Sequence, residues 1–118
     1  MSTKFNMTRD INGYNGFGLK FADDSYQTTL AANVAQTLTV PSNYPNWIAI
    51  FVVSPGSNIW IANNDEATVP GGSFLQDSSE LNPVARQVKS GDILSFITAD
   101  ATNPYVNVLF YIIEPLGN

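Results

Sequence analysis

The chain has 118 residues, of which 44% are hydrophobic and only 13% charged, a composition that suits one domain with a single core. Its formal net charge is -5 and its few basic residues are scattered, which argues against nucleic acid, because phosphate binding needs clustered lysine and arginine. Histidine and cysteine are both absent, so a serine-histidine-aspartate triad, a thiol nucleophile and disulfide bridges are excluded.

Acidic residues are the remaining candidates for chemistry. A carboxylate pair could serve glycoside hydrolysis, but a chain with ten acidic residues brings some pair together by chance. Asp23-Asp24 and Asn63-Asn64-Asp65-Glu66 offer the oxygen ligands that calcium prefers, without the spacing of a calcium loop. We therefore expect solvated carboxylates in turns, no catalytic residue, no bound metal and no cofactor.

The N-terminal residues 1–16 are rich in asparagine and glycine, and they carry three widely spaced apolar residues, Phe5, Ile11 and Tyr14. These follow neither a helical nor an alternating period. The pattern predicts an extended N-terminal arm, followed by one domain at 17–118, and makes the three apolar residues candidate contacts to a partner. A frayed terminus is the alternative.

The chain also lacks the features of a targeting or membrane segment. Met1–Asp10 has no basic region followed by an apolar run, so it does not resemble a signal peptide. The longest apolar run, Trp47–Val53, is far shorter than the roughly 20 residues of a membrane-spanning helix. We expect synthesis in the cytoplasm and no contact with a membrane.

From residue 17 onward the sequence predicts short strands punctuated by proline, because all seven prolines fall between or at the ends of apolar stretches. Ser54-Pro55-Gly56-Ser57 and Lys89-Ser90-Gly91-Asp92 place a glycine at two of the turns. The expected fold is all-β: a single-domain β-sandwich or jelly roll of about eight short antiparallel strands. The predicted strands are 17–21, 26–32, 36–40, 47–53, 58–62, 84–88, 93–98 and 105–113, and 63–83 is predicted to be a loop with at most one short strand.

Two of the predicted strands are apolar on both faces. In Trp47–Val53, alternation places Trp47, Ala49 and Phe51 on one face, and isoleucine and valine on the other. The strand at 105–113 shows nearly the same pattern. A two-layer sandwich needs only one apolar face per strand, so the second face requires a cover. Loops of the same chain, the N-terminal arm or another subunit are the open alternatives.

Trp60 is a further candidate contact residue. Ile59 and Ile61 are expected to point to one face of their strand, which leaves Trp60 on the other face with Asn58 and Ala62. An exposed indole there could stack on a sugar ring or pack against a protein, whereas a buried one would belong to the core.

Over residues 36–113 the order of strands and turns resembles that of small virion proteins of tailed bacteriophages. The resemblance is a rhythm of strands and turns without an invariant chemical motif, so it assigns no functional residue. The segments that carry it are Leu38-Thr39-Val40-Pro41, Trp47, Ser54-Pro55-Gly56-Ser57-Asn58-Ile59-Trp60-Ile61, Leu81-Asn82-Pro83, Val84–Ile93 and Val106–Ile113.

The resemblance implies a non-enzymatic capsid decoration, or cement, protein on the surface of the virion. Such a protein binds the outside of the assembled capsid and stabilises contacts between subunits of the major capsid protein. Neighbouring copies of the chain, or a homo-oligomer, would be further partners. The alternative is a carbohydrate- or receptor-binding module of a phage fibre or tail, which would use Trp60 and the loop around Pro70-Gly71-Gly72.

Overall fold

The computed structural model describes residues 21–71 and 78–113, and these residues form strands and connecting loops without a helix. The predicted all-β class is therefore confirmed. The strands are β1 (Asp24–Thr29), β2 (Gln36–Thr39), β3 (Asn46–Val53), β4 (Ile59–Asn63), β5 (Glu80–Leu81), β6 (Ala85–Lys89), β7 (Ile93–Thr98) and β8 (Tyr105–Ile112).

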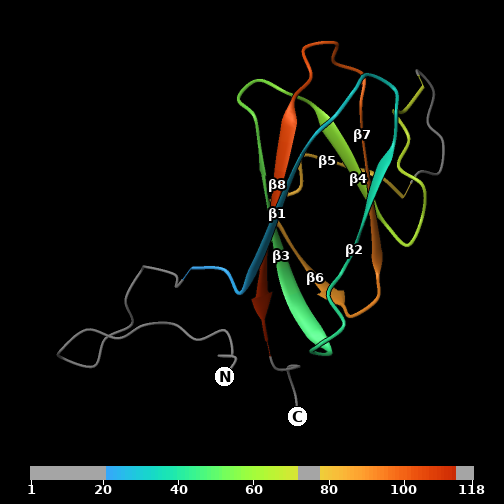
Figure 1. The fold of residues 1–118 in the computed structure, drawn as a ribbon. Coiled ribbons are helices and arrows are strands. Elements are labelled where there is room, and N and C mark those ends of the chain that lie inside the picture. Colours follow the sequence, from blue (N-terminus) through green and yellow to red (C-terminus); the bar gives the residue numbers. More distant parts are fainter. Residues whose placement is uncertain (1–20, 72–77, 114–118) are drawn as a thin grey trace.

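The strands form two antiparallel sheets that lie one over the other (Figure 1). The first sheet, called here the β8–β3 sheet, has the order β1-β8-β3-β6. The second, the β7–β4 sheet, has the order β2-β7-β4-β5. Each sheet thus takes strands from both halves of the chain, and its two central strands are the apolar ones.

The core lies between the facing surfaces of the two sheets. Trp47, Phe110 and Ile59 are fully buried there. The rings of Phe51 on β3 and Phe96 on β7 meet edge to face across the core, with their centroids 6.2 Å apart. The alternation predicted for β3 is confirmed, since Trp47, Ala49 and Phe51 are buried, whereas the residues between them are half-buried or exposed.

Both glycine turns adopt the conformation that the sequence indicates. Gly56 and Gly91 have φ angles of 73° and 79°, in the left-handed region that glycine enters without strain. Of the predicted strands, those from β2 onward lie within one or two residues of their observed bounds. The first described strand was predicted at 26–32 but spans Asp24–Thr29, and the strand predicted at 17–21 falls, except for Phe21, outside the described residues.

Asn82 fixes the short strand β5 to the beginning of β4. Its backbone N–H donates to the Ile59 carbonyl, and its side-chain oxygen accepts from the Ile59 N–H, both at 2.9 Å. The side-chain amide also donates to the Ser57 carbonyl at 3.0 Å. Asn82 has a φ of 45°, a left-handed conformation that asparagine tolerates better than most residues.

The long β4–β5 connection covers part of the outer face of the β7–β4 sheet. Ala67 in this connection is 1% exposed, and its N–H donates to the Ser95 hydroxyl of β7 at 3.0 Å. Ser95 and Ala62 point away from the core, yet each is 2% exposed. For this sheet, a loop of the same chain therefore supplies cover for the second face.

Candidate binding surface

The central part of the outer face of the β8–β3 sheet is almost entirely apolar. Pairing of β3 with β8 sets Ile48 beside Tyr111, Ile50 beside Leu109 and Val52 beside Asn107. Ile48, Ile50 and Leu109 are half-buried, and Val52 is 44% exposed. We call the group Ile48, Ile50, Val52, Tyr105, Asn107 and Leu109 the outer apolar face.

The strands that flank this face add few charges to it. On β1 the residues that point the same way are Ser25, Gln27 and Thr29, and on β6 they are Ala85, Gln87 and Lys89. Lys89, beside Asn46 at one end, is the only ionised side chain among these. A partner could therefore be placed against the face without desolvating an ion.

Asn107 is the one polar side chain at the centre of the outer apolar face. It lies between Val52 on β3 and Gln27 on β1. Its Oδ1 atom is buried and accepts no hydrogen bond from the residues that the structure describes. A buried acceptor without a hydrogen bond destabilises the folded state. When a partner covers the face, a hydrogen-bond donor from that partner, or a rearrangement of the Asn107 side chain, would remove this cost.

Trp60 lies on the outer face of the other sheet, as the alternation of β4 indicates. It is half-buried, beside Ile97 on β7 and the 46% exposed Leu81 on β5. Trp60 therefore belongs neither to the core nor to the freely exposed residues. Of the loop at Pro70-Gly71-Gly72, only the first two residues are described, and both are exposed.

The other three candidate contacts, Phe5, Ile11 and Tyr14, lie outside the described residues, as does the whole arm at 1–16. The structure therefore gives no position for these three residues relative to Trp60. It draws attention instead to the outer apolar face, which sequence reasoning identified only as a surplus of apolar residues in two strands.

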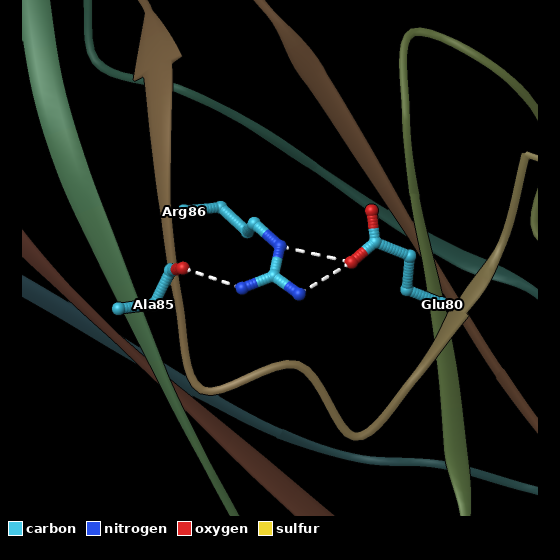
Figure 2. A network of polar contacts seen from close by, with 3 residues as sticks. All are labelled: Glu80, Ala85 and Arg86. Carbon is cyan, nitrogen blue, oxygen red and sulfur yellow. Dashed lines mark hydrogen bonds and ion pairs between the residues drawn. The ribbon is translucent and has the colours of Figure 1, made fainter.

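The two open sides of the sandwich each contain a small hollow. One, of about 200 Å³, lies between β1 and β2, with Phe96, Val106 and Val108 on its floor. The other, of about 260 Å³, lies where β5 approaches β6. There Arg86 Nε and Nη2 donate to Glu80 Oε1 at 2.8 and 2.6 Å, and Nη1 donates to the Ala85 carbonyl at 2.7 Å (Figure 2). Because both side chains of this ion pair are half exposed, it adds little stability.

Several acidic side chains accept hydrogen bonds from nearby backbone or side-chain donors. Asp92 is the clearest case, since its carboxylate accepts from the Asn63 and Asn64 side chains and from the Lys89 N–H, at 2.9 to 3.1 Å. Partial burial alone would raise the pKa of Asp92, but these hydrogen bonds and the Lys89 charge together hold that pKa below its usual value. In the described part of the chain, no three acidic residues converge on a point that could hold a metal ion.

Replacing Asp92 by asparagine is expected to lower the free energy of unfolding by about 1 kcal/mol at pH 7, with the loss limited by solvent screening. Because the pKa of Asp92 is lowered on folding, its stabilising effect is present above its unfolded pKa, near 4, and is lost as pH falls through the folded pKa. Urea unfolding of the wild type and of Asp92→Asn should be measured from pH 7 to pH 2. The difference between their free energies of unfolding should become smaller below about pH 4. A difference that stays constant over this range would contradict the role of the charge.

Comparison of the chain with protein-family models, with curated proteins and with solved structures finds no match. Among the described residues, no helix is long and apolar enough to cross a membrane.

Proposed function

We propose that the protein is a non-enzymatic decoration protein, which binds the outside of an assembled phage capsid and holds neighbouring major capsid subunits together. The observation that carries this proposal is the outer apolar face, a sheet surface with no ionised side chain at its centre. An apolar face of this kind suits contact with another protein surface better than it suits catalysis.

The strand order supports a finer statement of the fold. Sheets ordered β1-β8-β3-β6 and β2-β7-β4-β5 correspond to two interleaved Greek keys, the arrangement of a jelly roll. Jelly rolls occur in viral capsid proteins and in lectins, so the topology is compatible with a virion protein without assigning a function.

Repetition on a lattice would compensate for weak single contacts. A capsid presents the same surface many times, and linked weak contacts gain effective concentration without new chemistry. In this proposal the N-terminal residues Phe5, Ile11 and Tyr14 add a second contact to the capsid, by lying along a subunit or adding a strand to it. Trp60 is a further candidate contact.

The proposal is tested by cosedimentation of the purified protein with expanded empty capsids that have been stripped of accessory proteins. The intact protein is expected to bind at a fixed ratio per capsid. Val52→Lys should weaken binding tenfold or more, because it places a charge in the outer apolar face. Thr39→Lys is the matched control, since Thr39 is an exposed strand residue on the other sheet.

A truncation that lacks residues 1–16 separates the two proposed contacts. Weakened binding by the truncation with normal folding would support the arm as a second contact. If the intact protein does not sediment with the capsids, or if Val52→Lys and Thr39→Lys bind equally well, the outer apolar face is not the capsid contact.

A carbohydrate- or receptor-binding module is the second candidate function. It is favoured by a hollow of about 330 Å³ at one end of the sandwich, where Pro55, Asn103 and the 37% exposed Tyr105 lie together. An aromatic ring beside amide and hydroxyl groups is the chemistry that recognises sugars. Glycan binding that is lost in Tyr105→Ala or Trp60→Ala, with no binding to capsids, would support this function.

A further inference from the structure

The exposed edges of the two sheets differ in how they are protected. An edge strand carries backbone N–H and C=O groups that have no partner within the sheet, and proteins usually shorten, charge or cap such edges. The four edges here are β1 and β6 of one sheet, and β2 and β5 of the other.

Three of these edges are short or capped. Strand β5 has two residues and β2 has four. Strand β6 carries Arg86 and Lys89, and two of its outward backbone groups are already bonded. The Ala85 carbonyl accepts from Arg86 Nη1 at 2.7 Å, and the Lys89 N–H donates to Asp92 Oδ2 at 2.9 Å.

Among the residues that the structure describes, nothing caps or shortens the edge strand β1. The Leu30 N–H donates to the Pro104 carbonyl, so with alternation the even-numbered residues of β1 bond to β8. Ser25, Gln27 and Thr29 therefore present their backbone groups outward. Of these groups, the Thr29 carbonyl accepts from the Gln36 side chain at 3.0 Å, whereas those of Ser25 and Gln27 bond to no described residue.

The chain enters β1 from a direction that leaves this edge open. The Asp23 N–H donates to the Phe110 carbonyl, and the Asp23 carboxylate accepts from the Ile112 N–H, both at 2.9 Å. The residue before β1 is thus held against β8, on the side opposite to the free edge. Residues 21–23 also lack the Asn-Gly or Asp-Gly pair that most favours a tight hairpin back onto β1.

We propose that β1 pairs antiparallel with β1 of a second copy of this chain, in a register centred on Gln27, so that the two β8–β3 sheets join into one continuous sheet. A two-fold axis at Gln27 sets Ser25 opposite Thr29 of the other copy, and so satisfies the outward backbone groups in both copies. This inference goes beyond capsid binding, because it holds for any surface that the domain contacts.

The charge pattern of β1 favours a second copy as the occupant. Asp24 is its only charged residue, and in this register Asp24 faces Leu30 of the other copy. The two Asp24 carboxylates are then about 20 Å apart along the strands, too far for strong repulsion through solvent. Joining the sheets also places the two outer apolar faces on the same side of the continuous sheet, separated by the polar side chains of the two β1 strands.

The register is tested by charges at position 27, with molar mass measured by sedimentation equilibrium over a dilution series. The wild type should be a dimer that dissociates on dilution. Gln27→Lys and Gln27→Glu, each alone, should dimerise at least tenfold more weakly, because two like charges would lie directly opposite each other. An equal mixture of the two should regain dimers. Gln87→Lys, on the exposed edge strand β6 of the same sheet, is the matched control.

Backbone pairing is tested separately by Gln27→Pro and by amide exchange. Proline at position 27 removes an outward N–H without breaking the β1–β8 ladder, and Thr37→Pro makes the same change on the edge of β2. Only Gln27→Pro should abolish the dimer. In the wild type, the Ser25 and Gln27 amides should be protected at high concentration and exchange freely on dilution.

Three results would overturn the proposal: a monomer at every concentration, a dimer that tolerates both Gln27→Pro and Gln27→Lys, or protection of Ser25 and Gln27 that does not change with dilution. Circular dichroism of each variant separates loss of pairing from loss of folding. No capsid enters these measurements, so their outcome is independent of the capsid-binding test.

Discussion

Replacing Trp47 by alanine is expected to lower the free energy of unfolding by about 3 to 5 kcal/mol, a large part of the stability of a domain of this size. Trp47 is fully buried, and its ring packs edge to face on Phe110 and Tyr44, with centroids 6.0 and 6.2 Å apart. Its Nε1–H also donates to the Tyr44 carbonyl at 3.0 Å. The substitution therefore leaves a cavity and removes the donor of that carbonyl.

Trp60→Ala is the matched control for this prediction, because it removes the same side chain from the half-buried outer face of the other sheet. Urea unfolding followed by circular dichroism should show a clearly smaller loss for Trp60→Ala than for Trp47→Ala. Equal losses would mean that Trp60 is packed as tightly as Trp47, and would rule it out as a contact residue on the surface.

The second large effect is expected at Asn82, where substitution by alanine should lower the free energy of unfolding by about 2 to 4 kcal/mol. The substitution removes the acceptor of the Ile59 N–H and the donor to the Ser57 carbonyl. It also places alanine at a φ of 45°, which strains a residue with a Cβ atom and no local hydrogen bond.

A series of substitutions at Asn82 separates these causes. Aspartate retains the acceptor for the Ile59 N–H, whereas glycine relieves the backbone strain but loses both side-chain bonds. The expected order of thermal stability is asparagine, then aspartate, then glycine, then alanine. If glycine were as stable as asparagine, the bonds to Ile59 and Ser57 would contribute nothing, and the conformation alone would explain the residue.

The sequence allowed much of the fold to be predicted, because short apolar strands are separated by turns that contain proline or glycine. Gly56 and Gly91 occupy turns that their neighbours indicate, and Trp47 shares one face of its strand with Ala49 and Phe51, as alternation indicates. Strand β5 could not be placed, since it has two exposed residues and depends on the bonds of Asn82 to Ile59. Bonds between residues far apart in the chain leave no local pattern.

The candidate surfaces were less predictable for the same reason. The sequence showed that two central strands are apolar on both faces, but not which second face a loop covers. The covering contact, Ala67 against Ser95, joins a loop residue without distinctive chemistry to a strand residue of the other half of the domain. Likewise, the difference between the β1 and β6 edges depends on where the side chains of Arg86 and Asp92 reach.

The pairing of the first described strand with the last sets the order of events during synthesis. Asp24 pairs with Phe110, and the Asp23 carboxylate accepts a hydrogen bond from the Ile112 N–H, so β1 cannot join its sheet until β8 has left the ribosome. Strand β3 can form its pairing with β8 only at the same late stage, because Trp47 pairs with Ile112. The β8–β3 sheet can therefore close only after β8 has left the ribosome, and contacts this distant in sequence are typical of domains that fold in milliseconds to seconds. Until that sheet closes, the apolar strand Asn46–Val53 lacks its β8 partner, and an apolar strand exposed during folding is prone to aggregation.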